Sequence, residues 1–486
     1  MLWAVVSCQP GAGELPARGV AGGTASRVAE LTGHAMVRRE VSALSASKKK
    51  FKARVTELLE VGSSGRDEAI AELKMMGEDA IGPLLEALED NDYKLRMVAA
   101  RYLGDVAMEA AVPALVTALS DSSKNVQRCA ADALTKIGQA AVEPLLDALI
   151  GKDQSARKWA AEALGDIGDR SVALELVKRL TDQNIEVQRA AVTALGELKN
   201  KRTIEPLVEV LDTDNVELAK AAAEALGKIR SSIAIEPLIR ALSSPSVDVQ
   251  RAAAESLKAV GPECVPPLLI ELQSKDYIVR RWVVEILGEI GDDDARDGLI
   301  NALSDENSRV VHYAAIALGK IGKPSAIRYL VELLDHPEKD VRCAVVEGLA
   351  HIGTYHAVEH LERMLGDEDW VTRLTAVKGL GNVGGRTCLT PLCKALHDEE
   401  WAVRKHAAEG LGKVGIRKGA TEALIAAARD QKPSVRRSIA SALGELGGEE
   451  AAEVLKKLAS DPDDKVREAA EEALLSLESE GVTQQA

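Results

Sequence analysis

Short apolar stretches separated by polar loops recur along the chain from about residue 50 onward. One kind of stretch reads AVEPLLDAL at 141–149 and TIEPLVEVL at 203–211, with a proline near its start. The other kind reads NVQRCAADAL at 125–134 and KVREAAEEAL at 465–474, rich in alanine and leucine. Apolar residues spaced three and four apart share one face of an α-helix. The pattern therefore predicts units of two short amphipathic helices.

A leucine near the end of the second helix marks each unit. It recurs every 30 to 32 residues, at Leu73, Leu103, Leu134, Leu164, Leu195, Leu226, Leu257, Leu287, Leu318, Leu349, Leu380, Leu411, Leu443 and Leu474. A fixed period of this length indicates a repeat architecture. Neither helix can bury its apolar face alone, so neighbouring units must stack on one another. We therefore expect an all-α fold, an α-solenoid of about 14 two-helix repeats of ~31 residues.

Signals for helix ends accompany the apolar pattern. Proline in the first helix suits a first turn, where its missing N–H has no partner in any case. The second helix follows an Asp or Asn, a good N-cap, at Asp92, Asp153, Asn184, Asn215, Asn307, Asp369 and Asp463. A glycine follows the anchor leucine at Gly104, Gly165, Gly196, Gly227, Gly288, Gly319, Gly381, Gly412 and Gly444. We predict that these glycines are C-caps.

The repeats define the organisation of the chain. We expect a disordered leader or extension over 1–45, the solenoid over 46–478, and a polar C-terminal tail over 479–486. KARVTELLEV at 52–61 is interpreted as the opening outer helix. No segment is apolar over the length that a membrane span requires.

The second helix, written D-x-x-V-R-x-x-A-A-x-A-L-G-x-I-G, and the period near 31 residues resemble the short HEAT-like repeats of the phycobilisome (bilin) lyase family. The resemblance covers about residues 50–478. It implies that the first helix of each repeat lies on the convex side and the second on the concave side. Similar repeats occur in bilin lyase subunits, in the di-iron deoxyhypusine hydroxylase and in scaffolds without chemistry, so the resemblance alone leaves the function open.

The composition of the chain limits which residues form the core and which classes of partner are expected. Apolar residues make up 46% of the chain and aromatic residues only 2%, so the core must consist of Ala, Leu, Ile and Val. The net charge of −15 argues against a general nucleic-acid binder, which needs a basic surface. Six cysteines without CxxC spacing indicate neither a zinc site nor a disulfide framework, so we expect a cytoplasmic protein.

HAVEH at 356–360 has the H-x-x-E-H order of a zinc peptidase site. The segment aligns, however, with AVEPL and AIEPL of other repeats, and Glu359 occupies the position of Glu143 and Glu205, which have no histidine neighbours. We interpret it as a variant first helix and predict no metal, no cofactor and no catalytic residue. The His-Glu dipeptides that the resemblance would require for a di-iron hydroxylase are missing, so that activity is disfavoured.

Two rows of charged residues have competing interpretations. An arginine seven residues before the anchor recurs, as at Arg96 and Arg342, and an aspartate recurs thirteen before it, as at Asp121 and Asp367. These rows indicate either a basic strip for an anionic ligand or, as we favour, an Asp–Arg ladder between repeats.

The best prospect for function is the binding of another protein on the concave surface, especially around 157–313. Basic residues stand six before the anchor at Arg128, Lys158, Arg189, Lys220, Arg251 and Arg281, with mostly acidic residues four positions later. Aromatic residues replace alanine five before the anchor at Trp159, Trp282 and Tyr313. For these three, a partner-binding anchor and internal packing are weighed equally.

A second aromatic set stands ten before the anchor, at Tyr93, Tyr277, Trp370 and Trp401. For this set we favour packing on the preceding loop, although Trp370 and Trp401 are kept among the candidate partner-binding residues. We therefore predict a non-enzymatic protein-binding scaffold. A bilin-lyase-like activity is the alternative.

Overall fold

The computed structural model describes residues 72, 75 and 80–483. The expected leader over 1–45, the expected helix over 52–61 and the anchor Leu73 lie outside the described residues. The chain divides into two compact units, Met1–Ala163 and Leu164–Ala486. Within the described residues, all regular secondary structure is helical, which confirms the predicted all-α fold.

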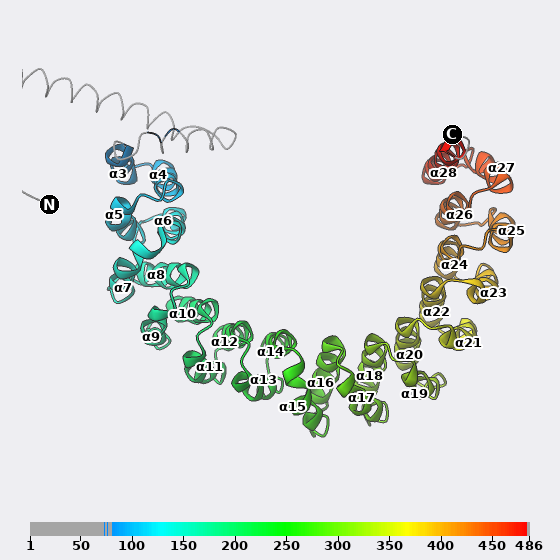
Figure 1. Cartoon of the computed structure of the whole chain (residues 1–486), viewed down its shortest axis with the longest axis horizontal. Coiled ribbons are helices and arrows are strands. Elements are labelled where there is room, and N and C mark those ends of the chain that lie inside the picture. The colour runs from blue at the N-terminus through cyan, green and yellow to red at the C-terminus, as the bar shows by residue number, and fades with distance from the viewer. Residues whose placement is uncertain (1–71, 73–74, 76–79, 484–486) are drawn as a thin grey trace, which may run out of the picture. The chain divides into compact units, whose positions relative to one another are not determined.

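The first unit stacks short outer helices beside longer inner helices (Figure 1). It contains α3 (Ile81–Leu88), α4 (Tyr93–Asp105), η3 (Glu109–Ala111), α5 (Val112–Ala118), α6 (Lys124–Ile137), η4 (Gly138–Ala141) and α7 (Val142–Leu149). The helix α8 (Gln154–Ile167) contains the boundary between the units.

The second unit continues the same alternation. Its inner helices are α10 (Ile185–Leu198), α12 (Val216–Ile229), α14 (Val247–Val260), α16 (Tyr277–Ile290), α18 (Ser308–Ile321), α20 (Lys339–Ile352), α22 (Trp370–Val383), α24 (Trp401–Lys413), α26 (Pro433–Leu446) and α28 (Asp464–Thr483). The last of these continues into the segment that we expected to be a polar tail.

The outer helices of the second unit are shorter, and most follow a 3₁₀ turn. They are η5–α9 (Arg170–Val172, Ala173–Val177), η6–α11 (Lys201–Thr203, Ile204–Leu211), η7–α13 (Ser232–Ala234, Ile235–Ala241), η8–α15 (Pro262–Cys264, Val265–Glu271), η9–α17 (Asp293–Ala295, Arg296–Ala302), η10–α19 (Pro324–Ala326, Ile327–Val331), α21–η11 (Tyr355–Arg363, Met364–Gly366), α23 (Arg386–Ala395), α25 (Arg417–Ala427) and α27 (Glu449–Leu458). Prolines such as Pro206 lie in the first turn, as predicted.

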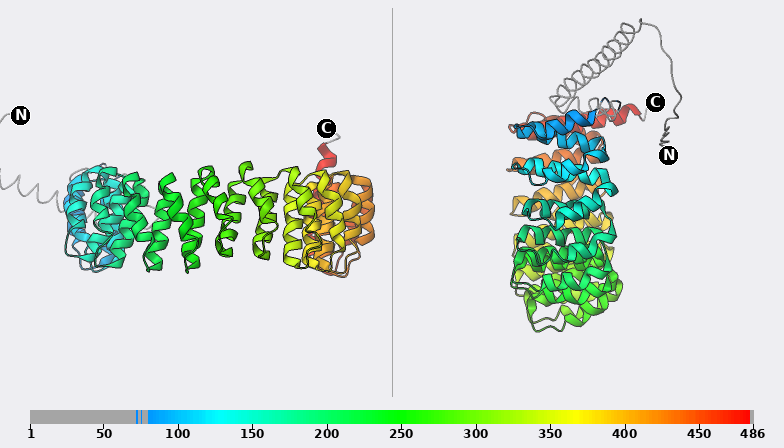
Figure 2. Two further views of the ribbon diagram at one scale, coloured as in Figure 1. Left: turned by 90° about the horizontal axis from the view of Figure 1, so that it is seen from below. Right: turned by 90° about the vertical axis from the view of Figure 1, so that its left-hand side faces the viewer.

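The helices of each unit stand nearly parallel to one another and across the direction of stacking (Figure 2). Within the second unit, the inner helices line the concave side and the outer helices the convex side (Figure 1). The anchor leucines from Leu103 to Leu443 are completely buried. Their recurrence therefore marks the core that consecutive repeats share.

The predicted N-caps are confirmed. The side chains of Asp92, Asn184, Asn215, Asn307 and Asp369 each accept a hydrogen bond from a backbone N–H in the first turn of the following inner helix. Asp153 and Asp463 make the same contact with Ala156 and Val466. These caps start every such helix at the position that the sequence indicates.

The prediction that the glycine after the anchor is a C-cap is wrong. Gly319, for example, lies inside α18, and it is Gly322, with φ +73°, that ends the helix in a left-handed conformation. A Cβ on Gly319 would stand 2.5 Å from the Cα of Gly348 in α20. The glycine is therefore needed because consecutive inner helices approach too closely for a side chain.

The small residue can come from either helix of a pair. Where Ala350 replaces the glycine, the residue facing it in the next repeat is Gly379, and a Cβ there would stand 2.6 Å from the Cβ of Ala350. Within the second unit, the exception is the pair α14 and α16, where Lys258 and Ile286 occupy the two positions. These helices are in less extensive contact than the other consecutive inner helices of the second unit.

Candidate protein-binding surface

The predicted Asp–Arg ladder exists. The arginine of one repeat makes a two-pronged ion pair with the aspartate in the loop before the next inner helix, in the pairs Arg96–Asp121, Arg280–Asp305, Arg342–Asp367, Arg373–Asp398, Arg404–Asp430 and Arg436–Asp461. The interpretation of these rows as a free basic strip is therefore wrong for the paired arginines. Their guanidinium groups form ion pairs and hydrogen bonds within the stack of repeats.

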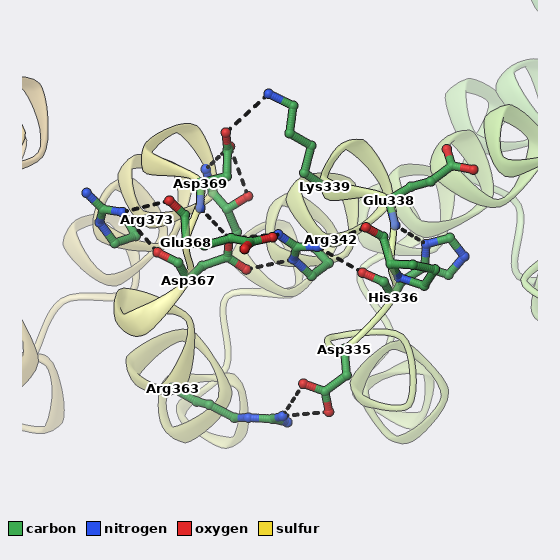
Figure 3. A network of polar contacts seen from close by, with 12 residues as sticks. Asp335, His336, Glu338, Lys339, Arg342, Arg363, Asp367, Glu368, Asp369 and Arg373 are labelled. Atoms are coloured by element: carbon green, nitrogen blue, oxygen red, sulfur yellow. Dashed lines mark hydrogen bonds and ion pairs between the residues drawn. The ribbon is translucent and has the colours of Figure 1, made fainter.

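Each ladder arginine holds two loops at once, as Figure 3 shows for Arg342. Its Nε and Nη2 donate to both carboxylate oxygens of Asp367, at 2.8 and 3.0 Å. Its Nη1 donates to the carbonyls of His336 and Pro337 in its own loop. The hydrogen bond to Asp367 raises the pKa of Arg342 further above its ordinary range. The contact is a buried, charge-assisted clamp between repeats.

Two of the repeats that lack the ladder are joined to the next repeat by another contact. Gln127 and Gln250 stand where others have arginine, and each accepts a hydrogen bond from a tryptophan of the next repeat. The donors are the indole nitrogens of Trp159 and Trp282, at 2.9 and 3.0 Å. Trp282 is only 6% exposed, which favours internal packing over a partner-binding role, the two alternatives weighed for this residue. Trp159 is half-buried.

The basic row six before the anchor is paired only in part. Lys158 and Arg281 form the expected pairs with Glu162 and Glu285, at 4.0 and 3.1 Å. Arg189 instead pairs with Glu186. The remaining members have no ion pair or side-chain hydrogen bond to any described residue: Arg128, Lys220 and Arg251. These three cations remain available for a ligand.

A groove of about 820 Å³ lies at the N-terminal ends of α14, α16, α18 and α20. We call it the tyrosine groove, after Tyr277 and Tyr313 in its lining. Its other lining residues include Val247, Gln250, Ile278, Arg281, Arg309, His312 and Asp340. Two of the predicted site residues, Arg281 and Tyr313, therefore meet in one concave feature, inside the predicted stretch 157–313.

Arg281 lines this groove and lies close to two aromatic rings. Its guanidinium carbon lies 3.9 Å from the ring centre of Trp282 and 5.4 Å from that of Tyr313. Burial raises the pKa of Glu285, and the charge of Arg281 opposes this rise. The arginine is thus held between two aromatic rings and a carboxylate, an arrangement that fixes its orientation before any partner arrives.

The four aromatic residues that stand ten positions before the anchor are partly exposed, which does not favour the packing that we preferred. We favoured packing for this set, yet Trp370 is 45% exposed, Trp401 40%, Tyr93 43% and Tyr277 38%. In the second unit, Ile185, Val216 and Val247 occupy the same position and are also exposed. This position opens the inner helix, where a side chain projects past the cap instead of against the previous turn. Large exposed apolar side chains in a row are typical of binding surfaces.

Sequence reasoning missed Arg309 and His312, which also line the tyrosine groove. His312 contacts the carbonyl of Asp340 through Nδ1 at 2.9 Å and the ring of Tyr313 edge-on. A signal existed in the sequence. His312 stands six before its anchor Leu318, which is the position of the basic row, and Arg309 stands nine before it, beside the aromatic position at ten.

HAVEH lies on α21, an outer helix, as its alignment predicted. Glu359 and His356 are exposed, and His356 contacts the ring of Tyr355. No cluster of three or more His, Cys, Asp or Glu side chains that could hold a metal ion occurs in the part of the chain that the structure describes.

Burial raises the pKa of Cys264 to about 11, which keeps this thiol protonated near neutral pH.

A family model described as HEAT repeats matches the chain over 81–165, 142–227, 173–258, 214–272, 265–341, 330–392 and 389–475. These segments cover most of the chain, which therefore belongs to the HEAT-repeat proteins. The general part of the resemblance is thus confirmed, and its narrower part, to the bilin lyases, stays a prediction. No curated protein matches the sequence. Over residues 72, 75 and 80–483, the chain has no helix with the length and apolarity of a membrane span.

Solved structures of similar fold share little sequence with this chain. Kap95p with RanGDP has a TM-score of 0.61 at 15% identity, covering 88% of this chain and 67% of Kap95p. Kap121p bound to Nup53p has a TM-score of 0.60 at 15% identity, covering 87% and 56%. Kap95 with Nup1 has 0.56 at 15%, covering 91% and 75%. At such identity the likeness establishes the solenoid fold alone, which confirms the predicted fold class.

Proposed function

We propose that the chain is a non-enzymatic, cytoplasmic scaffold that binds a partner protein along its inner helices. The observation that carries the proposal is the tyrosine groove, where Arg281 is oriented by aromatic rings next to the exposed Tyr277. Arginine and tyrosine are among the residues that contribute most to protein interfaces. The similar Kap proteins were solved with protein partners, which is compatible with this role.

The exposed apolar row extends the proposed surface. Trp370 and Trp401 open consecutive inner helices, and Arg373 clamps the two loops that precede them. Because these loops are held rigidly, little conformational entropy would be lost when a partner covers the tryptophans. We infer that they form a second contact for the same partner.

The test is affinity purification with quantitative mass spectrometry. We expect Tyr277→Ala with Tyr313→Ala to lose proteins that the wild-type chain captures, because both substitutions remove apolar contact area in the groove. The matched control is Tyr355→Ala, which removes an exposed tyrosine from the outer helix α21. A groove variant that captures the same proteins as wild type would exclude the tyrosine groove as the binding site.

The alternative is the bilin-lyase-like activity that the repeat pattern implies. It is tested by mixing the purified chain with free bilins and recording absorbance spectra. A shifted spectrum would indicate that the chain binds bilin and would favour the alternative. An unchanged spectrum would exclude it.

A further inference from the structure

A second groove, of about 910 Å³, lies over α12 and α14 and reaches the C-terminal end of α10. We call it the lysine groove. Five cations line it, and four of them have no ion pair or side-chain hydrogen bond to any residue that the structure describes: Lys199, Lys220, Arg230 and Arg251. Lys199, Arg230 and Arg251 are exposed, and Lys220 is half-buried.

The acidic residues of the groove only partly balance these cations. Glu197 is paired with Lys228 at 2.6 Å, and Glu255 with Lys258 at 2.6 Å. Glu224 and Asp248 also line the groove. Four unpaired cations thus face two further carboxylates, in a chain whose net charge is −15. The lysine groove is therefore a locally positive site on an acidic protein.

The backbone at two of the cations is strained. Lys199 and Arg230 are the C-caps of α10 and α12 and have left-handed φ angles of 50° and 51°. The other repeats of the second unit from α14 to α22 place a glycine at this position, as at Gly291 and Gly322. A residue with a Cβ is less stable than glycine in this conformation. Two adjacent repeats therefore have a strained backbone residue at this position, and in both repeats that residue is a cation that lines the lysine groove.

Strain that persists in a folded protein is characteristic of functional sites. We propose that the lysine groove binds an acidic segment, rich in Asp and Glu, of a partner protein. The inference rests on the proposed scaffold function and adds the charge of the partner. The competing explanation is that each cation merely compensates the negative end of its own helix dipole.

The experiment measures binding of a fluorescein-labelled glutamate-rich peptide to the full chain by fluorescence anisotropy, with a lysine-rich peptide of equal length as control. We expect the acidic peptide to bind and the basic peptide not to bind, and added salt to weaken the binding. Lys199→Gln with Arg230→Gln should weaken it by about three- to tenfold, because two exposed ion pairs are removed.

Substitution by glycine separates function from structure. Lys199→Gly with Arg230→Gly should weaken the peptide as much as the glutamine variant does, while raising the midpoint of thermal unfolding, because the strain is relieved. The control is Ala107→Gly, at another left-handed position with φ 57°, which should raise the midpoint without affecting the peptide. If the glutamine variant lowers stability but binds the acidic peptide like wild type, the helix-dipole explanation holds and our proposal is wrong.

Two further outcomes would also overturn the proposal. Equal binding of both peptides, or preferential binding of an oligonucleotide, would show that the groove does not select acidic protein segments. The double variant Tyr277→Ala, Tyr313→Ala should bind the acidic peptide like wild type. A failure of the lysine groove and a failure of the tyrosine groove are thereby observed separately.

Discussion

Two stretches of the second unit are built from the same repeat but joined differently. Between α20 and α28, four consecutive junctions are clamped by Arg342, Arg373, Arg404 and Arg436. Between α10 and α16, the same position holds Gln188, Ala219 and Gln250, and the facing position holds Thr213, Ser244 and Ser274. Both partners of the ladder are thus replaced together.

The two stretches also differ in which of the two grooves they contain. The lysine groove lies entirely in the unclamped stretch, and the tyrosine groove begins at its last junction, α14 to α16. The left-handed Lys199 and Arg230 also belong to this stretch. Regions that bind ligands are commonly drawn from the less stable parts of a structure. We infer that the unclamped stretch is adapted to the recognition of an acidic segment in the lysine groove, whereas the clamped stretch holds Trp370 and Trp401 on rigid loops.

The largest effect should follow removal of a clamp. Arg373→Ala leaves the largely buried carboxylate of Asp398 without its arginine partner, and we expect a loss of about 3 kcal/mol in the free energy of unfolding. Gln188→Ala, in the unclamped stretch, should cost about 1 kcal/mol, the value of a neutral hydrogen bond. Urea denaturation measures both, and equal losses would contradict the contrast between the two stretches.

A smaller loss should follow crowding of the helix contacts. Gly319→Ala places a methyl group against the backbone of Gly348, and we expect about 2 kcal/mol of destabilisation. Gly366→Ala is the control, because a Cβ there meets no atom within 4 Å. Thermal unfolding compares the two variants. If both melt like wild type, the inner helices tolerate more separation than their glycines indicate.

Acid should weaken the clamped stretch selectively. The hydrogen bond from Arg436 lowers the pKa of Asp461 in the folded chain. A lowered pKa contributes stability that is complete above the ordinary value, about pH 4, and is lost as the pH falls through the folded value. Hydrogen exchange followed by mass spectrometry should therefore show α26–α28 gaining exchange below about pH 4. Arg436→Gln should remove most of this pH dependence, and an unchanged profile would contradict the mechanism.

The smallest effect should follow construction of a new clamp. Gln188→Arg with Thr213→Asp introduces the missing pair between α10 and α12, and we expect a gain of about 1 kcal/mol. The single variants are the controls, since neither creates a pair. If the double variant is more stable and binds the acidic peptide less well, the lack of a clamp in this stretch serves binding. A gain in stability with unchanged binding would show that the two properties are independent.

Much of the fold could be predicted because each repeat contains the residues that specify its own helices. The period of Leu103 to Leu443 predicted the helices, and residues such as Asn307 predicted where each inner helix starts. The recurrence of Arg342 and Asp367 in register predicted the ladder. These features are local or repeated, so one copy confirms another.

The candidate surface was harder to predict, since exposure depends on the neighbouring repeat. Trp282 and Trp370 stand in equally polar surroundings along the sequence, yet Trp282 is buried against Gln250 and Trp370 projects into solvent. The two residues stand at different repeat positions, five and ten before the anchor, and the adjacent inner helix decides which of these positions is covered.

The sequence by itself determined the repeat, its helix starts and the pairing of its charged rows, because all three depend on spacing along one chain. Only the tertiary structure decided that the glycine after each anchor is a packing residue, since the approach of α18 to α20 sets that requirement. It likewise decided which cations remain unpaired in the lysine groove and that Arg281 lies between aromatic rings. Those properties arise between repeats, where distances are set by packing and not by sequence separation.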